Sequence, residues 1–247
     1  MLFANTVGSA QATATSPKVL HVAAAADLQP VLPALADAYQ RATGVRIVAS
    51  FGSSATLTQQ ITNGDPQDIF LSADMAHPQM LADAKLTDGA PVSYATGKLV
   101  LWARKDSPAQ PLSLASLTNA RVTRIAVAND AHAPYGLAAT QALRSLGLSE
   151  QLKPKFVIGE NIAQTAQLAE SGNAQAAFIS LTIASSEHFK VVGNFVPIAA
   201  STYQPIHQGA VVLRSSSQKQ LAHDFLRWLT SPAVQASFKN YGLEPAS

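Results

Sequence analysis

Short β-rich segments alternate with alanine-rich helical segments over most of this chain, and this alternation limits the folds that it can adopt. Strands are expected over residues 18–24, 45–50, 68–72, 97–104, 124–128, 155–158, 175–180 and 209–213. Helices are expected between them, over residues 28–42, 56–62, 136–146, 162–171 and 218–229. Alternation of this kind is typical of parallel or mixed sheets with helices on both faces. The sequence therefore predicts an α/β fold.

The strands and helices form two series of similar size that meet near residues 102–107, which predicts two α/β lobes. The first helix ends at Thr43-Gly44, with glycine at the position where helices commonly terminate. Pro33 removes an intrahelical hydrogen bond, so this helix is expected to start late or to be kinked. Asp27 precedes the apolar helical positions and is expected to be the N-cap.

Composition excludes several classes of function. The 247 residues include no cysteine, which removes disulfides, thiolate metal sites and cysteine nucleophiles. Seventeen basic residues against fifteen acidic ones leave a net charge of +2 without a basic patch, so no nucleic-acid partner is expected. The six histidines show no metal-ligand spacing, and no metal site is predicted.

The amino end differs from the rest of the chain. Residues 1–16 contain no lysine or arginine and no regular periodicity, and Ala10-Gln11-Ala12 is similar to an export cleavage site. We expect residues 1–16 to be a flexible tail or the remnant of an export signal. No segment approaches the roughly 18 apolar residues of a membrane span.

The candidate binding residues lie at four strand-to-helix junctions: 24–27, 51–55, 130–136 and 159–162. Ligands of open α/β sheets bind outside the carboxyl ends of the strands, where such junctions gather. Each helix start presents unpaired backbone N–H groups and the positive end of the helix dipole, which together favour an anion. None of the four junctions contains lysine or arginine. A shell of neutral donors favours a fully ionised oxyanion, because it offers no acceptor for a proton.

Simpler and rival interpretations exist for the same residues. Ser53 and Ser54, taken singly, are more simply helix N-caps. A serine-dependent α/β enzyme would need a base within reach, and His132 is the histidine nearest to a junction. The sequence lacks the G-x-S-x-G elbow, the phosphate loop with GK[ST] and the G-x-G-x-x-G fingerprint. A binder of sulfate or of a small carboxylate is a further alternative, although a carboxylate binder more usually places an arginine in its cleft.

Four segments carry a resemblance to a known family: AAAADL (23–28), TGVRIVASFGSSATLTQQITNGDPQDIFLSAD (43–74), APYGLAATQAL (133–143) and GENIAQTAQL (159–168). On these motifs the chain resembles the periplasmic molybdate-binding proteins, the substrate-binding components of molybdate ABC transporters. The resemblance covers nearly everything between Lys18 and Gly242. It implies a two-lobed periplasmic-binding-protein fold of type II, in which each lobe is a mixed sheet flanked by helices and the ligand lies in the interlobe cleft. The expected lobes comprise residues 17–103 with 204–247, and residues 104–203.

Carried over residue by residue, the resemblance implies oxyanion contacts in both lobes. The contacts of the first lobe are Asp27, Ser54 and Ala73, and those of the second lobe are Tyr135 and Ile162, chiefly through backbone N–H groups. The chain departs from some members of the family at two positions. Asp27 stands where they have a serine, which leaves only its amide as a donor, and Ser180 stands where they have a tyrosine. Ser180 is kept as a sixth candidate, with Tyr135 as an alternative source of the phenol.

The resemblance also implies a function. The chain is expected to bind molybdate, and tungstate because of its similar size and charge, and to deliver the anion to a membrane permease. It is expected to be a periplasmic monomer that needs no cofactor and catalyses no reaction.

Overall fold

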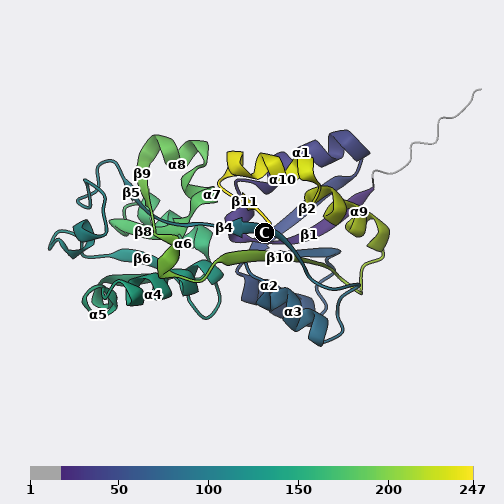
Figure 1. Ribbon diagram of the computed structural model, residues 1–247, viewed down its shortest axis with the longest axis horizontal. Coiled ribbons are helices and arrows are strands. Elements are labelled where there is room, and N and C mark those ends of the chain that lie inside the picture. Colours follow the sequence, from purple (N-terminus) through teal and green to yellow (C-terminus); the bar gives the residue numbers. More distant parts are fainter. Residues whose placement is uncertain (1–17, 247) are drawn as a thin grey trace, which may run out of the picture.

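The computed structural model describes residues 18–246, which form two mixed sheets side by side with helices against both (Figure 1). The expected tail over residues 1–16 lies outside the described residues. Among the residues described, no helix combines the length and the apolar character that a membrane crossing requires.

The first sheet has six strands in the order β11-β4-β10-β3-β1-β2. Its strands are β1 (Val19–Ala25), β2 (Arg46–Gly52), β3 (Ile69–Ser72), β4 (Val92–Gly97), β10 (Ile206–Val212) and β11 (Glu244–Pro245). β1 is parallel to β2 and β3, with Val22 opposite Ala49 and Ile69, whereas β10 is antiparallel to β3 and β4. The carboxyl ends of β1, β2 and β3 therefore lie at one edge of the sheet.

The second sheet has five strands in the order β7-β6-β8-β5-β9. Its strands are β5 (Leu99–Arg104), β6 (Ile125–Ala128), β7 (Phe156–Gly159), β8 (Ala176–Ser180) and β9 (Gly193–Pro197). β6 is parallel to β7 and β8, while β5 is antiparallel to β8 and β9. The carboxyl ends of β6, β7 and β8 thus also share an edge.

The helices and short turns connect these strands. The first half of the molecule contains η1 (Ala26–Leu28), α1 (Leu32–Thr43), α2 (Ser54–Thr62), α3 (Ala76–Asp83), α9 (Lys219–Leu229), α10 (Pro232–Ser237) and η5 (Phe238–Tyr241). The second half contains η2 (Ala115–Thr118), α4 (Pro134–Ser145), α5 (Ser149–Leu152), η3 (Lys153–Lys155), α6 (Ile162–Glu170), α7 (Leu181–Ala184), α8 (Glu187–Val192) and η4 (Ala200–Thr202). Sequence periodicity did not indicate several of the shorter elements, namely β4, β9, β11, α3, α5, α7, α8 and α10.

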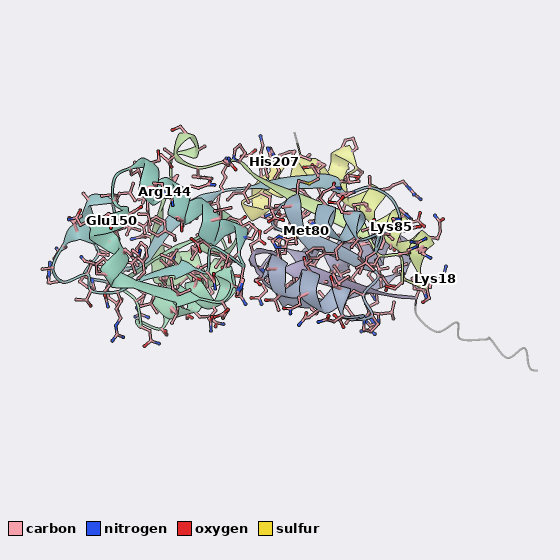
Figure 2. All side chains as sticks on the ribbon, turned by 90° about the horizontal axis from the view of Figure 1, so that it is seen from below. Lys18, Met80, Lys85, Arg144, Glu150 and His207 are labelled. Carbon is pink, nitrogen blue, oxygen red and sulfur yellow. The ribbon has the colours of Figure 1, made fainter. Side chains whose placement is uncertain are left out.

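The chain crosses between the sheets at two places, β4 to β5 and β9 to β10. In Figure 2, Arg144 and Glu150 lie in one half, Met80 and Lys85 in the other, and His207 near the boundary. β5 pairs with β8 and β9, so residues 99–103, which the sequence assigned to the first lobe, belong to the second sheet. The apolar run of β5 is continuous across that boundary and gives no sign of the change of sheet.

Local sequence signals fix several helix ends. Gly44 ends α1 with φ of 75°, the left-handed conformation that glycine adopts without strain. Pro33 stands in the first turn of α1, which begins at Leu32, so the expected late start is confirmed. Ser53 caps α2 and Asn161 caps α6, each accepting a hydrogen bond from a backbone N–H of the first turn.

Buried apolar side chains fill separate cores in the two halves. In the first half, Tyr39 packs edge-on against Phe225 of α9, with ring centroids 5.0 Å apart. In the second half, Trp102 is fully buried and packs against Phe189, again at 5.0 Å. Ala25, Ala26 and Ala73 of the first half join the core of the second half. The two halves are therefore in apolar contact at the edge where the parallel strands end.

Gly136 allows α4 to approach β6. A Cβ atom at this position would overlap the backbone carbonyl of Ala128, the last residue of β6. We expect Gly136→Ala to lower the free energy of unfolding by about 1–3 kcal/mol, because the helix must shift away from the strand. Urea titration measures the change. Leu137→Ala, on the exposed side of the same helix, is the control and is expected to have a much smaller effect.

Candidate functional site

A narrow cleft lies between the two halves, at the carboxyl ends of their parallel strands. Its cavity volume is only about 10 Å³, so the two halves lie close together here. Its lining comes from all four strand-to-helix junctions and from the residue after β3: Ala25, Ala26, Asp27, Gly52, Ser53, Ser54, Ala73, Ala133, Pro134, Tyr135, Asn161 and Ile162. The structure thus brings together five of the six predicted site residues, Ser180 being the exception.

The two serines of the second junction have different roles. Ser53 is the N-cap of α2, and its hydroxyl accepts a hydrogen bond from the Thr56 N–H at 3.1 Å. The hydroxyl of Ser54 accepts one from the Ala73 N–H at 3.1 Å. The Ala73 amide is therefore occupied, whereas the Ser54 hydroxyl keeps its own hydrogen to donate. The simple cap interpretation holds for Ser53 and not for Ser54.

Tyr135 and Ile162 lie at the starts of α4 and α6, on the far side of the cleft from Ser54. No hydrogen bond within residues 18–246 occupies the backbone N–H of Ser54, Tyr135 or Ile162. In each case the acceptor would have to lie one turn before the helix begins, where there is no helix. Three unoccupied N–H donors, one from each of three helix starts, are thus available at the cleft.

Asp27 also lines the cleft, and its carboxyl group is fully buried. Its Oδ2 accepts hydrogen bonds from the Tyr135 hydroxyl at 3.1 Å and from Gln208 Nε2 at 2.6 Å, while Oδ1 has no partner. Burial raises the pKa of this carboxyl to about 6, against the opposing effects of these two hydrogen bonds and of the backbone N–H of Asp27 itself. The prediction that Asp27 is a helix N-cap is wrong. The chain makes a 3₁₀ turn at Asp27 and α1 begins five residues later, so the side chain turns inward instead.

Gln208 is a residue of the site that the sequence did not reveal. It lies on β10, far along the chain from Asp27, at a β-bulge between Gln208 and Gly209. A bulge changes the direction in which a side chain points, and Gln208 is fully buried, with Nε2 also 3.1 Å from the Tyr135 hydroxyl. The only signal in the sequence is a glutamine immediately before the apolar segment 209–213 that was predicted as a strand.

Ser180 is buried and does not line the cleft. Its hydroxyl lies 2.7 Å from the Thr182 hydroxyl and accepts from the Ile183 N–H at 3.4 Å, as the N-cap of the short helix α7. Thr182 in turn donates to the backbone carbonyl of Asp27 at 2.7 Å. Ser180 therefore supports the junction at Asp27 from the second half of the molecule.

The cleft contains no cationic side chain among its lining residues. His132 is adjacent, since its carbonyl accepts a hydrogen bond from the Ala55 N–H at 3.3 Å. Its ring is turned toward Asn129 and Glu160, at 3.3 and 3.6 Å, and makes no hydrogen bond with Ser53 or Ser54.

Within residues 18–246, no group of three histidine or acidic side chains is arranged to hold a metal ion.

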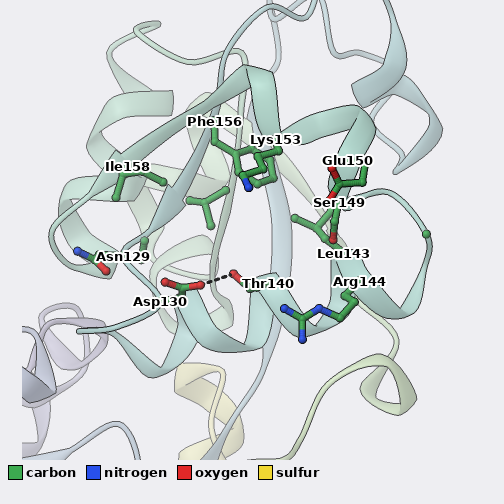
Figure 3. A pocket seen from close by; sticks show the side chains of 13 residues that line it. Asn129, Asp130, Thr140, Leu143, Arg144, Ser149, Glu150, Lys153, Phe156 and Ile158 are labelled. Atoms are coloured by element: carbon green, nitrogen blue, oxygen red, sulfur yellow. Dashed lines mark hydrogen bonds between the residues drawn. The ribbon is translucent and has the colours of Figure 1, made fainter.

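A larger cavity, of about 680 Å³, lies on the outside of the second half between α4, α5, β6 and β7 (Figure 3). Asp130, Arg144, Glu150 and Lys153 surround it, and Asp130 accepts a hydrogen bond from Thr140 at 3.1 Å. It contains none of the predicted site residues. Because acidic, basic and apolar side chains all line this cavity, it has no preference for an anion.

The buried Asp27 makes the stability of the protein dependent on pH. Its pKa is about 6 in the folded chain and 3.8 when exposed to water, so the folded state holds the proton more tightly. This contribution is fully present below pH 3.8 and is lost as the pH rises to about 6, a change of about 3 kcal/mol. We expect the stability of Asp27→Asn relative to wild type, measured in urea titrations, to increase by about 2 kcal/mol between pH 4 and pH 7.5, because part of the contribution is already lost at pH 4. Asp37→Asn, an exposed carboxylate on α1, should leave the profile unchanged.

Comparison with known proteins places the chain in a family. Residues 20–244 match the model of the bacterial extracellular solute-binding proteins. The molybdate-binding protein ModA of Azotobacter vinelandii is 33% identical over 94% of this chain and 92% of its own, and that of Escherichia coli is 30% identical over 90% and 87%. The solved structure of the Azotobacter vinelandii periplasmic molybdate-binding protein superposes with a TM-score of 0.83 at 32% identity, covering 92% of this chain and all of the other.

These relatives confirm the two-lobed fold of type II and the prediction that the chain is not an enzyme, because the family consists of solute-binding proteins. The serine-dependent enzyme is thereby set aside. The chain belongs to the bacterial extracellular solute-binding proteins and, within them, to the family of the molybdate-binding proteins.

Proposed function

We propose that the protein binds the molybdate oxyanion in the cleft between its two halves and delivers it to the membrane permease of an ABC transporter. The observation that carries this proposal is the convergence of three unoccupied helix-start N–H groups on a cleft without any cationic side chain. The names of the relatives, which match nearly the whole chain, support molybdate as the anion.

The donors suit a fully ionised tetrahedral anion. Ser54 offers its hydroxyl and its N–H from the first half, and Tyr135 and Ile162 offer N–H groups from the second. Each N–H lies at a helix start, where the helix dipole adds partial positive charge. An anion held by both halves is removed from water without any counter-ion, which strengthens each hydrogen bond.

Size is the proposed basis of selectivity. A cleft fitted to molybdate holds its donors too far apart for the smaller sulfate, and a buried donor left without a partner is costly. Tungstate has the size and charge of molybdate and is proposed to bind as well. Neutral donors therefore recognise the anion by geometry rather than by charge alone.

Delivery requires that the cleft open and close. We propose that the two halves are lobes that move about the two crossings, at Lys98 and between β9 and β10. Main-chain continuity limits relative motion to rotation about these segments, as in other hinged binding proteins. The protein is proposed to act in the periplasm as a monomer, with the closed form docking on the permease.

Thermal unfolding with different oxyanions tests the ligand. A ligand at about 100 times its dissociation constant adds roughly 2.7 kcal/mol to the stability of the native state. We expect molybdate and tungstate to raise the Tm of ligand-free protein, and sulfate and phosphate at equal ionic strength to leave it unchanged. An equal shift with sulfate would point to a less selective anion binder, and no shift with any of the four anions would contradict the proposal.

Replacing Ile162 by proline tests the backbone donor directly. Proline lacks the N–H but is well tolerated at the first position of a helix, and the preceding Asn161 already has the extended backbone that proline requires, with φ of −146° and ψ of 174°. We expect Ile162→Pro to weaken molybdate binding at least tenfold in isothermal titration calorimetry. Ile162→Val, which trims the side chain and keeps the N–H, is the matched control and should bind nearly as wild type. Equal affinities for the two variants would remove this amide from the site.

A further inference from the structure

The cleft places an acidic side chain beside the position proposed for an anion. Asp27 lines the cleft, and its side chain is fully buried. Within residues 18–246 it forms no ion pair. A dianion in the cleft would lie against an uncompensated carboxylate in a medium of low dielectric, where repulsion between like charges is strong.

One oxygen of this carboxylate is available for a proton. Oδ2 is occupied by hydrogen bonds from Tyr135 and Gln208, and Oδ1 has no partner although it is buried. A carboxylate can only accept hydrogen bonds, whereas the protonated acid carries one donor. Protonation of Oδ1 therefore removes the repulsion and gives this buried oxygen a hydrogen to donate.

The groups around Asp27 do not replace that proton. Tyr135 of α4 and Tyr94 of β4 are buried phenols whose pKa values lie well above the ordinary value, chiefly through burial, so they stay neutral. Besides α4 and β10, which supply Tyr135 and Gln208, the elements β2, α6 and α7 pack against η1. On β10, the exposed His207 contacts Thr96 instead. Arg46 lies at the opposite end of β2, Glu170 lies at the far end of α6, where it contacts His188, and α7 has no titratable side chain.

We propose that Asp27 takes up one proton from solvent when the oxyanion binds, so that filling of the cleft is coupled to protonation of this carboxyl group. The inference rests on the proposed function. The carboxyl already holds its proton more tightly than an exposed aspartate does, with a pKa of about 6. A bound dianion raises that pKa further, because it disfavours the ionised form. Above pH 6, affinity therefore falls as the pH rises, until the pKa of the complex is reached.

Calorimetry of the wild-type protein with sodium molybdate provides the test. Titrations at pH 7.5 in two buffers of different ionisation enthalpy give the number of protons taken up, expected to approach one per anion. Between pH 6 and pH 8.5, the dissociation constant is expected to rise by up to tenfold per pH unit. Tight binding with no proton uptake and no pH dependence would overturn the inference and leave the proposed function standing. Absence of molybdate binding at every pH would overturn the proposed function, and the inference with it.

Variants assign the proton to a residue. Asp27→Asn carries no charge at any pH, so we expect its molybdate affinity to be independent of pH and its proton uptake to be zero. Histidines titrate in the same range, and His132 and His77 lie close to the cleft. His132→Gln and His77→Gln are the matched controls, in which the pH dependence should persist. A pH dependence that survives in Asp27→Asn, or disappears in either histidine variant, would assign the proton elsewhere. If Asp27→Asn fails to fold, the absence of proton uptake by the wild-type protein would still overturn the inference.

Discussion

Hydrogen bonding at the buried carboxylate of Asp27 connects the two halves of this protein. Tyr135 of the second half and Gln208 of the first both contact Oδ2, and Thr182 of the second half donates to the main-chain carbonyl of the same residue. Gly97 lies against this group, since a Cβ atom there would overlap the Tyr135 hydroxyl. The close approach of the two strand edges, and hence the shape of the cleft, depends on this arrangement.

The cleft offers an anion backbone amides and a hydroxyl but no positive side chain. Its donors are held by helices whose starts are fixed by local caps, such as Ser53 and Asn161, and by the packing of Gly136 against β6. Donors fixed in this way need little reorganisation when a ligand enters, and they discriminate by distance. A carboxylate among them is unfavourable for an anion unless it is neutral, and its burial makes the neutral form accessible near physiological pH.

Much of the fold could be predicted because its signals are local. Strand and helix periodicity located most elements, Pro33 indicated the late start of α1, and Gly44 indicated its end. Periodicity failed for β4, where the alternation is weak, and for the change of sheet at β5, where a continuous apolar run crosses the boundary. The choice of pairing partner is a tertiary property, so a single strand's sequence could not assign residues 99–103 to the second sheet.

The sequence by itself determined the α/β class, the four junctions and the absence of cationic residues from them, because each follows from residue type and spacing. Only the tertiary structure decided how the side chains at those junctions are used. It turned Asp27 inward, paired the Ala73 amide with Ser54, kept Ser180 out of the cleft and brought in Gln208 through a bulge. Most of these outcomes depend on contacts between residues far apart in the chain, up to 181 positions, for which local sequence provides no signal.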